Sequence, residues 1–346
     1  MKVSVISFTP NGDLLNKRLM GMFVQNESEH YGNSSGLIKR TDTLKEWTGE
    51  RFGISDALVF IGAAGIAVRA AAPFIKGKER DSAVVVVDEL GRFVIPVLSG
   101  HMGGANAIAL KIAEYIGAVP VITTATDING IWAADTWAIK HDCTVANIEN
   151  IKFISGALLR GQKIGFKCDF PIKGSLPSNV CLDEIYECGI AISLNGDIKP
   201  FKKTLNIIPK CIHIGIGSRK GAEANAIVDL YKEIQKKYSF SDKAVKSIAT
   251  INIKKDEKAV KEFAKYLGIG LKIFDAEELN NAEGEFLSSD FVKKITGTDN
   301  VCERAAALSG GKKFIVRKTK GCGVTIAAAA EDWSADFEDS IGGNRL

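Results

Sequence analysis

Short apolar runs alternate with amphipathic segments through the first third of the chain. The runs at 2–8 and 56–62 have the length and composition of buried strands, while 41–52 and 63–75 repeat their apolar residues with helical spacing. The segment 82–100 holds two apolar runs joined by a short Glu-Leu-Gly link, which predicts a β-hairpin. Strands that alternate with helices predict an α/β sheet with helices on its faces.

A glycine-rich stretch, SGHMGGAN at 99–106, separates the second run of this hairpin from the next predicted helix. The apolar positions of that helix are Ala105, Ile108, Ile112 and Ile116. Gly103 and Gly104 stand immediately before it, and two explanations remain open. Free backbone N–H groups at a helix start can bind an anion, or the glycines simply form a tight turn that needs positive φ.

The alternating pattern weakens in the middle of the chain and returns near its end. Residues 132–209 contain short strand-like and helix-like pieces between proline and glycine residues, and a second alternating series begins at Cys211. We therefore predict two doubly wound-type α/β domains, residues 1–131 and 210–346, joined by a smaller α/β middle segment at 132–209.

Composition narrows the class of protein. The chain has 346 residues, 46% of them hydrophobic and 25% charged, which is typical of a soluble globular protein. Its net charge of +4 suits an anionic small molecule but not a nucleic-acid partner. No apolar run approaches the roughly 18 residues of a membrane span. Seven cysteines without a CxxC pair indicate reduced thiols in the cytoplasm rather than disulfides or a zinc site.

Four turns at predicted strand ends are candidates for ligand binding, because open α/β sheets bind ligands beyond the carboxyl ends of their strands. They are 62–69, 99–106, 123–130 and 215–221, and the first three are expected to converge on one sheet edge. The candidate binding residues are Gly62, Gly65, Arg69, Ser99, Gly100, Gly103, Gly104, Asn106, Thr123, Thr124, Gly215, Gly217, Ser218, Arg219, Lys220 and, in a basic run at 312–320, Arg317. The last turn reads GxGxxxG rather than GxGxxG, so a nicotinamide site is not indicated.

The chemistry-bearing candidates centre on one of four histidines. His101 stands on a polar turn after a strand, where an imidazole can act as a general acid or base, although a structural role is also open. Asp127 lies in the neighbouring turn. Asp88 and Glu89 occupy the hairpin tip, where turn formation alone can explain Asp88. No HxH or HExxH spacing occurs, so no protein-bound metal is expected.

Several segments together resemble the CbiG family of anaerobic cobalamin biosynthesis. They are FIGAAGIAVRAAAPFI, the pair SGHMGGAN and PVITTATD, and HIGIGSRKG with GTDNVCERAAALSGG. The resemblance spans nearly the whole chain, and the C-terminal domain is similar to CobE. It implies a cobalt-precorrin-5A hydrolase that opens a δ-lactone and releases acetaldehyde. Its partner is then an anionic corrinoid intermediate that carries its own cobalt, with no further cofactor, and neighbouring pathway enzymes are further candidate partners.

The resemblance also suggests roles for the candidate residues. His101 would activate water against the lactone carbonyl, while backbone N–H groups near Gly103 and Gly104 would stabilise the oxyanion. Asp127, or Asp88 with Glu89, would serve the later carbon–carbon cleavage. Many relatives carry a cysteine in the turn where this chain has Ser218, so no essential thiol is expected there. Two other classes stay open: a non-catalytic carrier of corrinoid intermediates, and an α/β enzyme that binds a nucleotide or sugar phosphate.

Overall fold

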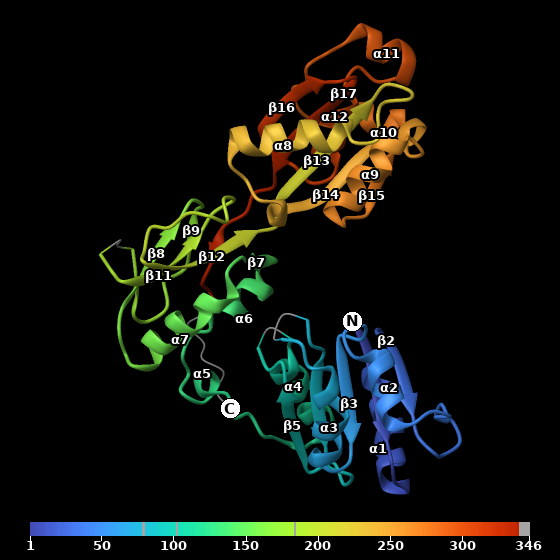
Figure 1. Cartoon of the computed structure of the whole chain (residues 1–346), viewed down its shortest axis with the longest axis vertical. Helices are drawn as coiled ribbons and strands as arrows, with labels where there is room; N and C mark the ends of the chain where they lie inside the picture. The colour runs from blue at the N-terminus through green and yellow to red at the C-terminus, as the bar shows by residue number, and fades with distance from the viewer. Residues whose placement is uncertain (78–79, 102, 183–184, 339–346) are drawn as a thin grey trace. The chain divides into compact units, whose positions relative to one another are not determined.

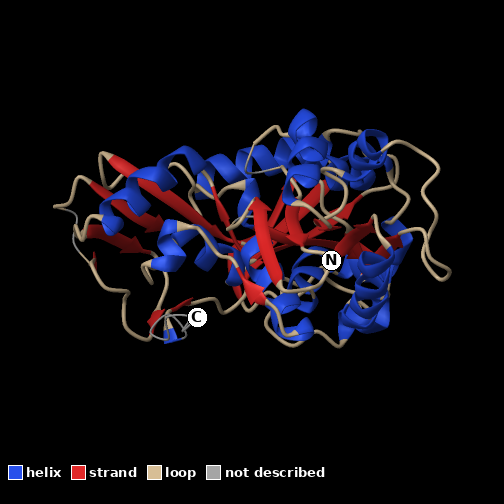
Figure 2. Cartoon of the chain, turned by 90° about the horizontal axis from the view of Figure 1, so that it is seen from below, coloured by secondary structure: helices blue, strands red, loops and turns tan. Residues whose placement is uncertain are grey.

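The chain folds into two compact units, Met1–Thr136 and Trp137–Leu346 (Figure 1). The computed structural model describes residues 1–77, 80–101, 103–182 and 185–338. Both units combine helices with strands, so the predicted α/β class is confirmed (Figure 2). Within the described residues, no helix has the length and apolar character needed to cross a membrane.

The first unit is built on a six-stranded sheet in the order β2-β1-β3-β4-β5-β6. The strands are β1 (Lys2–Ser7), β2 (Glu27–Tyr31), β3 (Ala57–Ile61), β4 (Ala83–Val87), β5 (Phe93–Leu98) and β6 (Val119–Pro120). The first four strands are parallel to one another. β5 pairs antiparallel with β4, as the predicted hairpin requires, and β6 runs parallel to β5. The hairpin therefore reverses the direction of the chain within the sheet.

Helices cover both faces of this sheet. They are α1 (Pro10–Met22), α2 (Leu44–Arg51), α3 (Ala64–Ala71), a 3₁₀ turn (Ala72–Phe74) and α4 (Ala105–Ile116). After β6 the chain forms the short α5 (Ala125–Ile128) and then α6 (Ala134–Lys140), which continues into the second unit. Leu19 of α1 and Ile112 of α4 belong to the core on one face. Trp47 of α2 and Ala67 of α3 belong to the core on the other. α1 and β2 were not predicted, because their sequences lack a regular apolar pattern.

The second unit begins with a five-stranded sheet in the order β10-β8-β11-β12-β7. Its elements are β7 (Cys143–Val145), a 3₁₀ turn (Ile148–Asn150), α7 (Ile151–Leu159), β8 (Ile164–Cys168), β9 (Ile172–Lys173), β10 (Val180–Cys181), β11 (Cys188–Ile192) and β12 (Lys203–Pro209). β9 pairs with β18 (Ala335–Asp336), and Trp137 stacks on Phe337 with ring centroids 4.9 Å apart. The far end of the chain is thereby tied to this segment.

A second five-stranded sheet follows, in the order β15-β14-β13-β17-β16. Its strands are β13 (Ile212–Ser218), β14 (Val245–Ile251), β15 (Leu271–Phe274), β16 (Lys313–Gly321) and β17 (Val324–Ala330). Its helices are α8 (Ala226–Tyr238), α9 (Lys258–Leu267), α10 (Ala276–Asn280), α11 (Asp290–Thr296) and α12 (Val301–Leu308), with 3₁₀ turns at Asp242–Ala244 and Asn252–Lys254. α8 and α9 share the core of one face and α12 that of the other. Since β17 is antiparallel to β13, the β16–β17 turn lies at the carboxyl end of β13.

Candidate active site

The β4–β5 hairpin decides which turns of the first unit can meet. Because β5 and β6 run against β3 and β4, their carboxyl ends lie at the opposite edge of the sheet. Ser99, after β5, donates its hydroxyl to the carbonyl oxygen of Asp81, which precedes β4, over 3.1 Å. Gly62, after β3, instead donates its amide to Val87 at the end of β4. The expectation that all three turns converge is therefore wrong: 99–106 and 123–130 meet, and 62–69 does not.

The edge of the sheet at the carboxyl ends of β3 and β4 carries five of the predicted site residues: Gly62, Gly65, Arg69, Asp88 and Glu89. Asp88 Oδ1 accepts the amides of Arg92 at 2.7 Å and Phe93 at 2.6 Å, which closes the hairpin. Glu89 accepts the hydroxyl of Thr9 at 2.7 Å. β4 alone has five residues, or roughly 16 Å of extended chain, between this edge and the other. Asp88 and Glu89 therefore cannot act on the same bond as His101.

At the other edge, His101 lies between two carboxylates. Its Nε2 is 3.0 Å from Asp127 Oδ2 and 3.1 Å from the hydroxyl oxygen of Thr126. Its Nδ1 is 3.4 Å from Asp135 Oδ2. His101 lies in the turn before α4, Asp127 lies in α5, and Asp135 lies in the first turn of α6. An imidazole with a carboxylate at each nitrogen is held in orientation and can pass a proton between its two sides.

This setting favours the charged form of the imidazole. The hydrogen bond and negative charge of Asp135, helped by Asp127, raise the pKa of His101 even though burial acts in the opposite direction. Burial acts to raise the pKa of Asp135, but its hydrogen bond to His101 and the imidazolium charge outweigh it, and that pKa is lowered. The Asp135 side chain is only 6% exposed, whereas that of Asp127 is 33% exposed. Asp127 is therefore the carboxylate that a ligand can reach.

Asn106, at the start of α4, fixes the exposed carboxylate. Its side-chain amide donates to Asp127 Oδ2 at 2.8 Å and to the hydroxyl oxygen of Thr124 at 2.9 Å. In the part of the chain that the structure describes, Asp127 Oδ1 has no hydrogen-bond partner. One oxygen of Asp127 is thus committed to His101 and Asn106, and the other remains available to a substrate. Thr123, in the same turn, is exposed.

The glycines of the 99–106 turn have structural explanations. Gly104 adopts φ +79°, in the left-handed region, and a Cβ on Gly103 would lie 2.3 Å from that of Ser99. A Cβ on Gly100 would meet the side chain of Asn106 at 2.8 Å. The amides of residues 104, 105 and 106 donate to the backbone carbonyls of residues 101, 99 and 100. Those three amides are already hydrogen-bonded, so they are not available to an oxyanion, and the tight-turn explanation accounts for Gly104.

Two residues of the cluster were missed in the sequence. Thr126 adjoins Asp127, and Asp135 is the one charged residue in the stretch IWAADTWA at 131–138. A single carboxylate in such a stretch, shortly after the turn that carries Asp127, was the available signal. The other histidines have ordinary polar partners: His30 contacts Asn16, His141 contacts a backbone carbonyl, and His213 contacts Ser247 and Glu331.

The C-terminal candidates divide into two groups. Gly217, Ser218, Arg219 and Lys220 line a pocket of about 560 Å³ at the carboxyl end of β13. Gly215 does not, because a Cβ there would lie 1.7 Å from the carbonyl oxygen of Cys302 in α12. Arg317 also points elsewhere: it donates to the carbonyl of Glu285 at 3.0 Å and pairs with Glu303 at 3.4 Å. Among the described residues, no group of three or more His, Cys, Asp and Glu side chains could hold a metal ion.

Fold and site define a class of α/β protein with an acid–base centre made of one imidazole and two carboxylates. Family comparison makes the assignment specific. A family model described as Cobalamin synthesis G N-terminal matches residues 46–127, and one described as Cobalamin synthesis G C-terminus matches residues 212–329. The chain belongs to this CbiG family, as its motifs suggested.

Full-length relatives agree with the family models. The chain is 32% identical to the cobalt-precorrin-5A hydrolase of Salmonella typhimurium, over 94% of this chain and 96% of the relative. It is 28% identical to the cobalt-precorrin-5A hydrolase of Priestia megaterium, over 94% of each. A crystal structure of a putative cobalamin biosynthesis protein G homolog from Sulfolobus solfataricus matches 95% of this chain and 97% of its own, with 25% identity and a TM-score of 0.40.

Proposed function

We propose that the protein is a cobalt-precorrin-5A hydrolase, which opens the δ-lactone of its substrate and releases acetaldehyde in cobalamin biosynthesis. Two relatives carry that name and align along almost the entire chain. The structural observation that carries the proposal is the imidazole of His101, held between Asp127 and Asp135 with one carboxylate oxygen left for the substrate. Such a centre can supply both a base and an acid to one hydrolytic reaction.

In lactone opening, Asp127 and His101 take complementary roles. The free oxygen of Asp127 accepts a proton from the attacking water, whose oxygen bonds to the lactone carbonyl carbon. The tetrahedral intermediate collapses, its ring C–O bond breaks, and the leaving alkoxide takes a proton from the imidazolium of His101. The raised pKa of His101 supports this assignment, since it increases the protonated fraction of the donor relative to a free imidazole. Asp135 remains ionised and positions the ring.

The second step is a retro-aldol cleavage. A base removes the proton from the hydroxyl group released by lactone opening, the adjacent carbon–carbon bond breaks, and acetaldehyde departs. The electron pair stays on the ring carbon, which then takes a proton. After lactone opening the centre holds a proton on Asp127 and a neutral His101, so His101 is the base available for the hydroxyl and Asp127 the acid for the ring carbon. Asp88 and Glu89 have no part in this scheme.

The proposal extends to the setting of the reaction. Cobalt arrives as part of the anionic corrinoid substrate, so the protein needs no cofactor of its own. All seven cysteines carry free thiols, which supports a reducing cytoplasm as the location. Ser99, Gly100, Gly103, Gly104, Thr123 and Thr124 border the acid–base centre and are proposed to contact the substrate.

Product analysis tests the function and separates it from a carrier. Purified protein is incubated anaerobically with cobalt-precorrin-5A, and both acetaldehyde and the corrinoid product are quantified by mass spectrometry. A hydrolase gives acetaldehyde and cobalt-precorrin-5B in equal amounts over many turnovers. A carrier would bind the corrinoid and return it unchanged, which would reject the proposal.

A further inference from the structure

A pocket of about 560 Å³ opens at the carboxyl ends of β13 and β14 in the second unit, where open α/β sheets bind ligands. The turn after β13 supplies Arg219 and Lys220. Lys254 follows β14, and the β16–β17 hairpin supplies Lys318 and Lys320. The pocket thus gathers positive charges from three separate segments of the chain. Its volume is within the range of small-molecule sites.

Most of these charges lack a protein counter-ion. Among the residues that the structure describes, no Asp or Glu lines the pocket. Lys254 pairs with Glu257 at 3.6 Å, but in the described residues no ion pair engages Arg219, Lys220, Lys318 or Lys320. Cations that converge without partners repel one another, so an anionic ligand relieves a repulsion as well as forming contacts. The pattern fits several carboxylates on one molecule better than a single anion.

One wall of the pocket is apolar. It is formed by α11, which buries none of its residues and presents Phe291, 72% exposed, and Ile295, 58% exposed, beside Val292. Isolated aliphatic and aromatic side chains are common at surfaces, but here they border a cavity that also holds the cations. A ligand with a flat apolar face and a charged rim matches both features.

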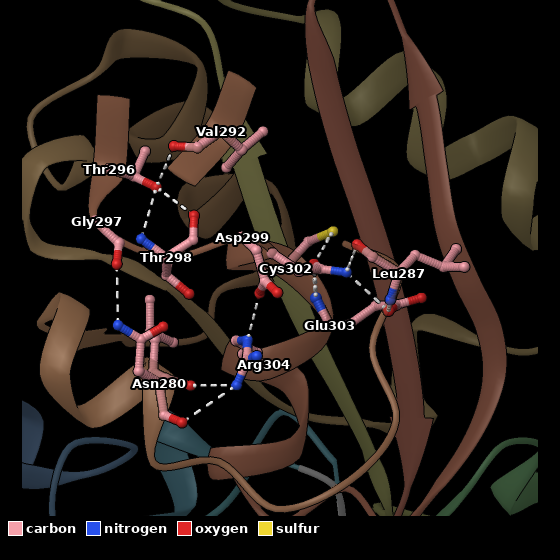
Figure 3. A network of polar contacts seen from close by, with 12 residues as sticks. Asn280, Leu287, Val292, Thr296, Gly297, Thr298, Asp299, Cys302, Glu303 and Arg304 are labelled. Carbon is pink, nitrogen blue, oxygen red and sulfur yellow. Dashed lines mark hydrogen bonds and ion pairs between the residues drawn. The ribbon is translucent and has the colours of Figure 1, made fainter. Parts of the chain in front are cut away.

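A polar network joins the segment that carries the apolar wall to α12 (Figure 3), and α12 is bonded in turn to strand β16. The fully buried Glu303 of α12 accepts the amide of Leu287 at 2.8 Å and that of Lys318 at 2.9 Å. Arg304 binds Asp299 at 2.8 Å, and the hydroxyl of Thr296 caps the carbonyl of Val292 at 2.9 Å. Glu303 therefore holds both the segment that leads into α11 and the strand that carries Lys318. This fixes the spacing between the apolar wall and the cations.

We propose that this pocket binds an edge of a corrinoid macrocycle, with its carboxylate side chains on Arg219, Lys220, Lys318 and Lys320 and one ring face against Phe291 and Ile295. The inference rests on the proposed function for the identity of the macrocycle. It assigns the C-terminal domain a binding role that does not need the acid–base centre around His101. Cys322, at the tip of the β16–β17 hairpin, lines the same pocket and is the exposed one among the seven cysteines.

That thiol makes a direct reporter of occupancy in the full-length protein. The rate at which Cys322 reacts with a thiol reagent such as DTNB is measured at increasing concentrations of dicyanocobyrinic acid. The side chains of this corrin end in carboxylates. Dicyanocobinamide, with amides in their place, serves as the uncharged comparison. The acid is expected to slow modification, cobinamide to slow it much less, and added salt to weaken the protection by the acid. The variant C322S identifies the signal.

Substitution of two lysines that line the pocket tests whether their charges bind the corrinoid. The double variant K318A/K320A is expected to raise the concentration of cobyrinic acid needed for half-protection about two- to thirtyfold, as expected for the loss of two partly exposed ion pairs. The control K312A/K313A removes equal charge from the same part of the chain without touching the pocket lining, and it should leave protection unchanged.

The outcomes separate this inference from the proposed function. If wild-type protein releases acetaldehyde from cobalt-precorrin-5A but cobyrinic acid never protects Cys322, the pocket assignment is wrong and the function stands. Equal protection by cobinamide, or equal effects of the two double variants, would also overturn it. Protection that depends on Lys318 and Lys320 without any acetaldehyde would retain the pocket and reject the hydrolase.

Discussion

Replacing Asp135 with asparagine removes one negative charge beside His101 while keeping the shape of the side chain. The asparagine oxygen can still accept a hydrogen bond from His101 Nδ1, and the site is well enclosed, with Asp135 5% exposed. The substitution therefore tests the electrostatic role of Asp135 separately from its packing. Thermal unfolding of the variant provides the control that it folds.

The size of the effect follows from the separation of the two groups. At 3.4 Å, Coulomb's law gives roughly 1.2 kcal/mol with the dielectric constant of water and roughly 4.9 kcal/mol at an effective value of 20. One pKa unit corresponds to about 1.4 kcal/mol. The pKa of His101 is therefore expected to fall by at least about one unit in D135N.

The assay is the single-turnover rate of lactone opening as a function of pH. If His101 acts as the acid, the rate falls as pH rises through its pKa, and in D135N this fall moves at least about one unit toward acid. Rates then nearly agree at low pH and differ by at least about tenfold above the wild-type pKa. A uniform loss of rate at every pH, with the inflection in place, would refute the electrostatic role of Asp135 and leave it a structural residue.

Four further substitutions test other parts of the proposed site and of the fold. Asp127→Asn should abolish lactone opening with corrinoid binding retained, whereas Glu89→Gln, at the other sheet edge, should keep the wild-type rate; equal effects would contradict the separation of the two edges. Because the pKa of His101 is raised, its charged form stabilises the folded state below its ordinary pKa of about 6.5, and this contribution is lost as pH rises through the raised value. The difference in unfolding free energy between wild type and His101→Gln should therefore shrink in urea titrations as pH rises from about 6.5 through the raised pKa of His101. Gly215→Ala should lower stability by about 1–3 kcal/mol in the same assay, because its Cβ would meet the Cys302 carbonyl; unchanged stability would reopen Gly215 as a ligand contact.

Local patterns predicted the elements around the active site well. The hairpin at 82–100 is formed by β4 and β5, and the helix after SGHMGGAN is α4, which ends at Gly117 with φ +70°. The prediction that three turns converge was wrong because it ignored the direction of β5, although β5 itself was predicted. A hairpin reverses the chain, so the turn after its second strand must lie at the edge opposite the turn after β3. The sequence contained that information.

Other features depended on contacts that no local pattern reveals. α1 buries Asp13 and Asn16 among its few buried residues, so its inner face is not apolar and its periodicity is hidden. α11 buries nothing and gave no helical signal either. Asp135 reaches His101 across 34 residues of sequence, and only the folded chain brings these two groups together. The same holds for Lys318 and Lys320, whose shared pocket with Arg219 exists only because β17 pairs with β13.

In the proposed mechanism, His101 exchanges protons with the substrate during lactone opening. The most direct measurement is the anaerobic single-turnover conversion of cobalt-precorrin-5A by wild type and by His101→Gln, with the lactone and its opened product followed by mass spectrometry. If His101 is the proton donor, the variant folds, binds the corrinoid and opens the lactone about 10²–10⁴-fold more slowly. Opening at the wild-type rate by His101→Gln would contradict the proposed mechanism.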